Sequence, residues 1–392
     1  MDIDDTESVT SAHTATGTIS SRSTRSMLTG TSMDGTPAPS VYSYRSDRDS
    51  RAMLREIAGR TLNSTNDLYL LPADEGEHGR LDKQHLVNLL AIGGLYIAVK
   101  EVREALVPIP DRQRAILDLG CGGGNWCMGM AQEFPHAQVI GVDLAPSTTR
   151  PPPFNCRFEF DDFTLGLEHY YNSFDVVHSR CTANGVVDYE GFIHEAAKCV
   201  RPGGVLLYTE GNLEMQSEQK IGQEPAFGEG GPNQSWLARA TFEAYNLMKK
   251  RGSYVDAGIM LGRWMESCPD LTDVQYRELW TPIGPWKKGS TIEETQRLEM
   301  VGTLMRQNMK EYVRSCKPMF VATGYPPALI ERFVEGTDRE LDELKIHMYV
   351  KWHHAWGRRR EKSNRPLGPA TQLSGTGGAI TVDEYETQMM VG

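Results

Sequence analysis

Residues 116–126, ILDLGCGGGNW, constrain this chain more than any other stretch, because an apolar run leads there directly into a cluster of glycines. The glycines are Gly120, Gly122, Gly123 and Gly124. Glycine adopts backbone conformations that a Cβ forbids, and it lets a ligand approach the main chain closely. The stretch therefore predicts a ligand-binding turn between a strand and a helix. A turn that serves packing alone is the alternative, and it needs fewer glycines.

Apolar runs of strand length alternate with helical stretches between residues 114 and 211. The strand-like runs are AILDL, QVIGVDL, RFEF, FDVVHS and VLLYTEG, and we expect helices at 126–133 and 189–200. This alternation is typical of an α/β fold, a doubly wound parallel sheet with helices on both faces. In such a sheet the first strand-to-helix turn, here the glycine stretch, is the usual ligand position.

Composition and periodicity divide the chain into five segments. In order, we expect a disordered Ser/Thr-rich tail (1–48), an N-terminal helical lid segment (49–113), a cofactor-binding core (114–211), a helical cap with closing strands (212–360) and a second disordered tail (361–392). Within the lid segment, Leu86–Leu106 is apolar at helical spacing and is interrupted at Gly93-Gly94. In the cap segment, residues 346–356 alternate apolar and polar side chains and predict a last strand.

Charge and cysteine usage exclude several classes of function. A net charge of −11 argues against a general nucleic-acid binder, which needs clustered Lys and Arg. The seven cysteines form no C-x-x-C pair, and His353-His354 would point to opposite faces of a strand, so no metal site is expected. The chain opens without a secretory signal and has no window of about 18 apolar residues. We expect a cytoplasmic or nuclear protein without a membrane span.

The spacing of the glycines bears on the ligand. The dinucleotide fingerprint G-x-G-x-x-G requires a glycine at position 125 when counted from Gly120, and that position is Asn125. The sequence instead reads D-x-G-x-G-x-G, with Asp118 two residues before the first glycine. A carboxylate there suits an amino group better than a pyrophosphate. The pattern favours S-adenosylmethionine, and an NAD-linked oxidoreductase is the less favoured alternative.

The ends of the later strands supply further candidates. Asp143 ends the second strand, where its two oxygens can accept hydrogen bonds from both ribose hydroxyls, a device that NAD domains share. Asp162 and Phe163 follow the third strand, where a carboxylate and a ring suit an adenine. His178 and Arg180 end the fourth, near the expected reactive methyl. They are candidates for a base and a positioning cation, and core packing is the alternative for His178.

Together, ILDLGCGGG, VIGVD, FEFDDF, FDVVHSR and RPGGVLL resemble the successive motifs of class I S-adenosylmethionine-dependent methyltransferases over residues 114–211. Residues 67–90 further resemble the segment that precedes the core in fungal LaeA-like proteins, which are methyltransferase-fold regulators and enzymes of secondary metabolism. The resemblance implies a Rossmann-like, seven-stranded sheet in which residues 346–356 form the antiparallel strand beside the fifth. It also implies that Tyr69 and Arg80 close over the methionine end of the cofactor, against the alternative of a capping helix with a solvated arginine.

Two functions follow from these motifs. The first is an enzyme that methylates a small organic acceptor, enclosed by the cap with its four tryptophans, Trp236, Trp264, Trp280 and Trp286. The second is a regulatory protein that binds the cofactor and acts through a protein partner, which the N-terminal tail would contact. The acceptor itself has no signature in the sequence.

Overall fold

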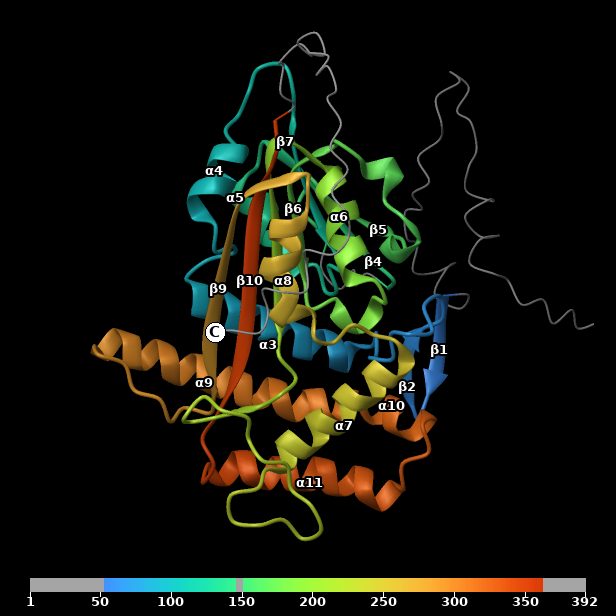
Figure 1. Cartoon of the computed structure of the whole chain (residues 1–392), viewed down its shortest axis with the longest axis vertical. Helices are drawn as coiled ribbons and strands as arrows, with labels where there is room; N and C mark the ends of the chain where they lie inside the picture. Colours follow the sequence, from blue (N-terminus) through green and yellow to red (C-terminus); the bar gives the residue numbers. More distant parts are fainter. Residues whose placement is uncertain (1–52, 146–150, 362–392) are drawn as a thin grey trace, which may run out of the picture. The chain divides into compact units, whose positions relative to one another are not determined.

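The computed structural model describes residues 53–145 and 151–361. The expected tails at 1–48 and 361–392 therefore lie outside the described residues, apart from position 361. A large mixed sheet occupies the upper half of the molecule in Figure 1, and most of the helical cap lies below it. No helix in the described part of the chain is long and apolar enough to cross a membrane.

The sheet has the predicted topology. Five strands are parallel and run in the order β5-β4-β3-β6-β7. They are β3 (Arg114–Leu119), β4 (Ala137–Asp143), β5 (Cys156–Phe160), β6 (Phe174–Arg180) and β7 (Val200–Gly211). The last strand, β10 (Met348–Arg359), pairs antiparallel with β7, as predicted for residues 346–356. Beyond it, β9 (Leu271–Ile283) and the two-residue β8 (Gln216–Ser217) both pair with β10, which makes eight described strands in this sheet.

Helices cover both faces of the sheet because successive strand residues point to opposite sides. On one face, Ile116 and Val139 pack with α4 (Val99–Ala105) and α5 (Asn125–Glu133). On the other, Leu117 and Ile140 pack with α6 (Tyr189–Cys199) and α8 (Ala257–Ser267). The expected helices in the core are therefore present, and the alternation of buried residues along each strand explains the two layers.

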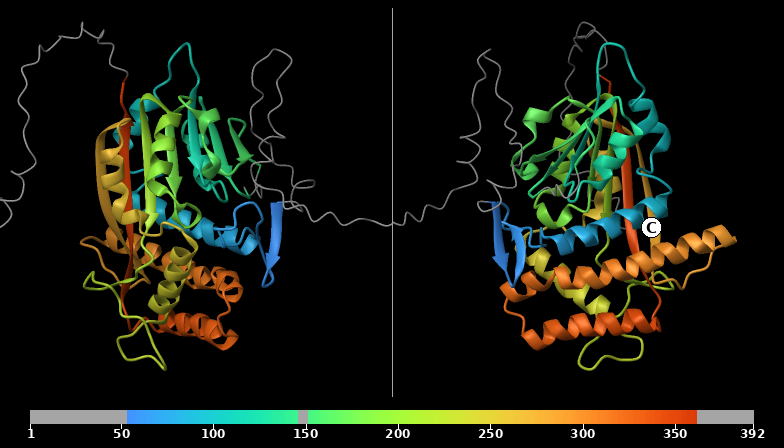
Figure 2. Two further views of the ribbon diagram at one scale, coloured as in Figure 1. Left: turned by 45° about the vertical axis from the view of Figure 1, so that its right-hand side comes forward. Right: turned by 180° about the vertical axis from the view of Figure 1, so that it is seen from behind.

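The cap has a hydrophobic core of its own. It is built from α7 (Trp236–Arg251), α9 (Ile292–Ser315), α10 (Lys317–Ala322) and α11 (Pro327–Glu343). The helix α3 (Glu75–Ile92) joins it to the sheet, since α3 runs across the lower ends of the strands and lies along α9 (Figures 1 and 2). The carboxyl ends of the parallel strands therefore meet the cap.

The lid segment differs from the expected helices at its start and agrees with them at the glycine pair. It begins with a hairpin, β1 (Leu54–Ile57) and β2 (Arg60–Asn63), which the helical periodicity did not indicate. The interruption predicted at Gly93-Gly94 is confirmed, since α3 ends at Gly93, whose φ of 78° is left-handed, and α4 starts anew at Val99. Glycine favours this helix-ending conformation because it has no Cβ to clash.

Candidate functional site

A cavity of about 200 Å³ lies at the carboxyl ends of the parallel strands. It is bordered by the glycine turn after β3, the ends of β4, β6 and β7, the loop after β5, and the helices α3, α7 and α9. Every residue that the sequence singled out as a site residue lines this cavity except Gly124. This is the place where ligands bind in open α/β sheets, beside the point at which the strand order reverses.

The glycines of the turn have two different roles, close packing and access to the cavity. Gly120, Gly122 and Gly124 all have left-handed backbones, with φ of 79°, 52° and 76°. A Cβ on Gly120 would collide with the Thr182 methyl, and one on Gly124 with the Phe158 ring, so packing alone requires these two glycines. A Cβ on Gly122 would meet only the end of Leu81, at 3.1 Å. Of these three, Gly122 is thus the one whose small size keeps cavity space open.

Asp143 secures the glycine turn from the neighbouring strand. Its Oδ2 accepts the backbone N–H of Gly122 at 2.8 Å, and its Oδ1 accepts that of Ala145 at 3.1 Å. Burial raises the pKa of this carboxyl, and the two N–H donors oppose that shift. Because each carboxylate oxygen has a second lone pair, both can still accept a ligand hydroxyl.

Asp162 and Phe163 lie together at the end of β5. Oδ1 of Asp162 accepts the backbone N–H of Thr164 at 3.0 Å and so begins a short turn of 3₁₀-helix, and burial raises the pKa of this carboxyl. The Phe163 ring stacks on Phe192 of α6, with ring centroids 4.7 Å apart. A carboxylate and a fixed aromatic ring thus border the same end of the cavity.

Asp118 has partners inside the protein. Its Oδ1 lies 2.7 Å from Nδ1 of His178, and its Oδ2 accepts the Cys127 thiol at 3.2 Å. The imidazole of His178 also stacks on Trp126, with ring centroids 4.0 Å apart. Burial lowers the pKa of His178, with Asp118 opposing the shift. A neutral imidazole whose Nδ1 donates to Asp118 has its basic lone pair on Nε2.

Arg180 differs from Arg80, the other arginine that lines the cavity, because Arg80 is paired with a carboxylate. Nη2 of Arg180 lies 3.3 Å from Nδ1 of His85 on α3, and no carboxylate pairs with it within residues 53–145 and 151–361. Burial and the Arg180 charge lower the pKa of His85 to about 4, so this contact adds no second positive charge at neutral pH.

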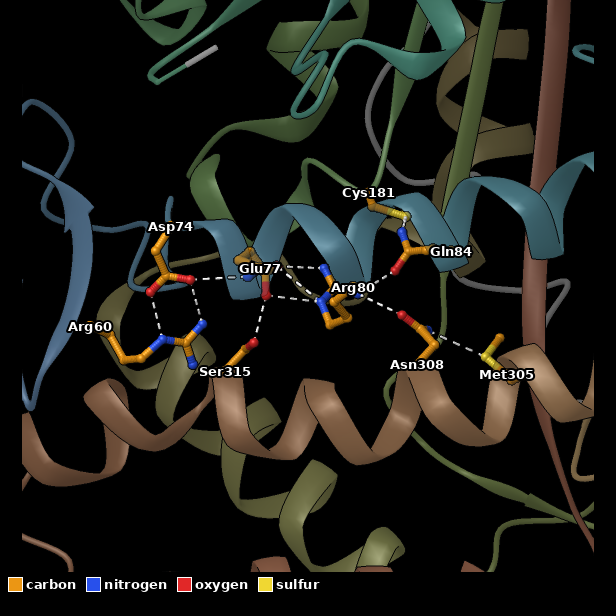
Figure 3. Close-up of polar contacts among 9 residues, drawn as sticks. All are labelled: Arg60, Asp74, Glu77, Arg80, Gln84, Cys181, Met305, Asn308 and Ser315. Carbon is orange, nitrogen blue, oxygen red and sulfur yellow. Dashed lines mark hydrogen bonds and ion pairs between the residues drawn. The ribbon is translucent and has the colours of Figure 1, made fainter. Parts of the chain in front are cut away.

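Arg80 belongs to a buried polar network between α3 and α9, which we call the α3–α9 seam (Figure 3). Its guanidinium donates to Glu77 at 2.6 Å, and its Nη1 donates to Gln84 at 2.6 Å and to Asn308 at 3.1 Å. Ser315 of α9 donates to Glu77 at 2.5 Å. Burial opposes the charge of Arg80, but Glu77 raises its pKa on balance. The alternative of a solvated arginine is wrong, since Arg80 is 3% exposed.

The hairpin that sequence analysis missed holds the start of α3. Asp74 accepts the backbone N–H of Glu77 at the helix N-terminus and binds Arg60 of β2 through two hydrogen bonds of 2.6 and 2.8 Å (Figure 3). Tyr69, between the hairpin and α3, lines the cavity, and burial raises its pKa. Its hydroxyl makes no hydrogen bond within the described part of the chain.

The expectation about the cap tryptophans is wrong. All four are described, and none lines the cavity. Trp264 packs against Tyr189 and Tyr254, while the other three lie against His347 or basic side chains. Apolar side chains from separate elements form the cap wall instead: Met248 of α7, Met305 and Met309 of α9, and Val350 and Trp352 of β10. Methionine fills irregular space well, but no local pattern marks it as a pocket residue.

Glu210, at the end of β7, is a further residue that the sequence did not single out. Its Oε1 accepts the backbone N–H groups of Thr182 and Ala183 and the hydroxyl of Tyr189, at 2.8, 3.2 and 2.7 Å. Burial raises the pKa of Glu210 to about 7, although these donors favour the charged form. Glu210 therefore holds the connection after β6 against the cavity. Only its position in TEG, after the fifth predicted strand, could have indicated it.

Known proteins with similar sequences or folds include methyltransferases and a regulator of secondary metabolism. Residues 110–252 match a family model described as a methyltransferase domain. The secondary metabolism regulator laeA of Coprinopsis cinerea is 31% identical over 326 residues, which are 82% of this chain and 78% of that protein. Methyltransferase pytC of Aspergillus terreus is 28% identical, over 71% of this chain and 79% of its own. A solved structure of Haemonchus contortus phosphoethanolamine N-methyltransferase 2 with S-adenosylhomocysteine is 16% identical, with a TM-score of 0.38 over 71% of this chain and 58% of that one. From its sheet topology, its motifs and its relatives, this chain belongs to the LaeA-like family of class I S-adenosylmethionine-dependent methyltransferases.

Proposed function

We propose that this protein transfers a methyl group from S-adenosylmethionine to a small organic acceptor of secondary metabolism. One observation carries the proposal: the Asp143 carboxylate binds the N–H of Gly122 at the reversal point of the strand order, directly beside the cavity. A carboxylate in this place joins the glycine turn to any ligand that presents vicinal hydroxyls to it. The relative named methyltransferase pytC supports the same activity.

The residues of the cavity fit the parts of the cofactor in order along the strand ends. We assign the ribose to Asp143, the adenine to Asp162 and Phe163, and the methionine end to Tyr69 and Arg80. The main chain of Gly120, Gly122 and Gly124 forms the turn beneath it. We assign the amino group of the methionine end to Asp118 as well. Because Asp118 is also bonded to His178, its carboxylate would have to serve both partners at once.

Bound S-adenosylmethionine supplies a methyl group that its sulfonium already activates. The protein then has to align the acceptor and exclude water, and it needs no dedicated catalytic residue for an acceptor that is already nucleophilic. For a hydroxyl acceptor, we propose that Nε2 of His178 takes the proton, because Asp118 holds the imidazole in the tautomer that leaves Nε2 basic. Arg180 is the matching candidate for positioning an acceptor oxygen.

Calorimetry on the full chain tests the cofactor assignment. S-adenosylmethionine should bind, and NAD should bind at least ten times more weakly. Tighter binding of NAD would contradict both the cofactor and the reaction. Incubation with a methyl-labelled donor and a metabolite extract then tests transfer, since an enzyme releases labelled small molecules that a boiled sample does not.

A second function is favoured by the name of the Coprinopsis relative, a secondary metabolism regulator. In this case the chain binds the cofactor and acts from the nucleus or cytoplasm through a protein partner, with residues 1–48 as the contact. Those residues lie outside the described part of the structure. A pull-down with the full chain and with a chain lacking residues 1–48 separates the two functions, because a small-molecule enzyme keeps its activity without the tail.

A further inference from the structure

The cap end of the cavity, which we call the cap chamber, lies far from the predicted adenine and ribose positions. Its walls are Met248, Val255, Met305, Met309, Val350 and Trp352. Between Asp143 at the end of β4 and the start of β10 stand β3, β6 and β7. Four strand spacings of 4.7–4.9 Å separate β4 from β10 by about 19 Å. The chamber is therefore space beyond the cofactor-binding half of the site.

The cap chamber contains no free charge on its walls. None of its six wall residues is ionisable. Of the charged groups that line the rest of the cavity, Arg80 is paired with Glu77 at 2.6 Å, Oε1 of Glu210 accepts two backbone N–H groups and a tyrosine hydroxyl, and Arg180 has no carboxylate partner within the described residues. A charged group seated among the six wall residues would lose its hydration without gaining a counterion from them, which is costly in an apolar environment.

Two polar donors border this apolar space without a strong partner: the buried indole N–H of Trp352, which has no hydrogen-bond partner within residues 53–145 and 151–361, and the side-chain amide of Asn308. Asn308 lines the cavity, is 2% exposed and lies between Met305 and Met309 on α9. Its Oδ1 accepts an N–H of Nη1 of Arg80 at 3.1 Å, whereas, among the residues that the structure describes, its Nδ2 donates only to the Met305 sulfur, at 3.4 Å. A thioether is a weak acceptor, so a buried amide N–H remains available for a better one.

We propose that the cap chamber binds the methyl acceptor and selects uncharged, mainly apolar molecules that carry an oxygen for Asn308. This rests on the proposed methyl transfer and extends it to the class of acceptor. The flexible methionines let the chamber adapt to several apolar shapes. The competing inference is an acidic acceptor whose carboxylate pairs with Arg180, the site cation that has no carboxylate partner within the described residues.

A displacement series distinguishes these acceptors. The full chain, saturated with S-adenosylhomocysteine, is titrated with the neutral fluorophore N-phenyl-1-naphthylamine, and the bound fluorophore is displaced with 1-decanol, decanoate or decylammonium below their micelle concentrations. The three competitors share one tail and differ in charge. We expect decanol to displace at a concentration at least tenfold below that of either ion. Decanoate that competes as well as decanol would assign the acceptor to Arg180 and overturn the proposal, as would a fluorophore that fails to bind.

Variants on one helix locate the binding. Met309→Trp places a larger side chain in the chamber and should weaken fluorophore binding at least tenfold. Met300→Trp is the matched control, because Met300 lies on the same helix and is 57% exposed, and it should change nothing. If Met309→Trp fails to fold, as judged by thermal melting, Met248→Phe on α7 replaces it with the same expectation. Equal fluorophore affinity in the filled and control variants would contradict the proposal.

Calorimetry with S-adenosylmethionine keeps the two proposals separate. Each folded variant should bind the cofactor as the wild type does. If the wild type binds the fluorophore but not the cofactor, the proposed function fails while the preference of the chamber for neutral molecules is still measured. If the cofactor binds and the charge preference is absent, only the inference about the acceptor fails.

Discussion

The two halves of the cavity are built in different ways. The part of the cofactor half that we assign to the ribose and adenine consists of backbone and carboxylates at the ends of consecutive strands, so its residues fall within 118–163 and lie close in sequence. The cap half is made of apolar side chains from α7, α9 and β10, which are up to about a hundred residues apart. The difference shows why the cofactor half has a readable motif and the cap half has none. Local backbone geometry demands particular residues, whereas a packed apolar wall accepts many.

Gly122→Val is expected to have the largest effect, and it tests the backbone half. The valine side chain enters the cavity, where a methyl carbon of Leu81 is the nearest atom to the added Cβ. The left-handed backbone also strains a β-branched residue by roughly 1–2 kcal/mol. We expect S-adenosylmethionine binding to disappear in calorimetry while the fold persists in circular dichroism. Gly228→Val is the control, since Gly228 has a similar φ of 58° and nothing within 4 Å of its Cβ. Loss of binding in both variants would show that strain, and not ligand space, is responsible.

Breaking the ion pair of the α3–α9 seam should have the next largest effect, which is on the free energy of unfolding. Glu77→Gln leaves the buried Arg80 charge without its counterion, so unfolding in urea should need about 3–5 kcal/mol less free energy. The half-exposed pair of Glu195 and Lys198 has the same i,i+3 spacing, and Glu195→Gln should cost about 0–1 kcal/mol. Replacing Glu77 and Arg80 together by methionine should recover most of the loss. Equal costs for the two single changes would mean that the seam does not hold the cap.

Asp143→Ala should weaken S-adenosylmethionine binding by about one to two powers of ten. Hydrogen bonds to charged groups contribute roughly 1.5–3 kcal/mol each, and solvent compensates part of the loss. The change also releases the N–H of Gly122, so the glycine turn loses its anchor. Asp143→Asn keeps one acceptor oxygen and should do less damage. Calorimetry that finds the Asp143→Ala affinity unchanged would remove the ribose assignment.

The smallest expected effect is a pH dependence at the junction of the two halves. The pKa of Glu210 is about 7 in the folded chain and near 4.5 when unfolded, so the folded state binds more protons between these values. Its contribution to stability is therefore complete below about pH 4.5 and is lost as the pH rises towards 7. Between pH 5 and 7, wild type should lose on the order of 1 kcal/mol relative to Glu210→Gln, measured by urea unfolding. Parallel pH profiles would show that Glu210 does not titrate there.

Much of the cofactor half was predictable from particular residues. The interval from Asp118 through the glycines to Asp143 indicated which strand ends meet, and the structure brings them to one cavity. What the motif did not indicate is that Asp118 is already bonded to His178. That pairing depends on the register between two parallel strands, in which Asp118 lies beside His178 although 60 residues separate them. The roles of these residues toward the cofactor stay predictions.

The sequence by itself determined the strands of the parallel sheet, the last strand and the ligand turn, because strand periodicity and glycine conformation are local properties of the chain, while the antiparallel direction of the last strand came from the family resemblance. Only the tertiary structure decided the cap half. It placed Met305 and Met309 in the wall and the four tryptophans elsewhere, and it closed the α3–α9 seam between Arg80 and Asn308, 228 residues apart. Side-chain burial of this kind depends on how distant helices pack, and an apolar residue has the same local signal whether it faces a core or a cavity.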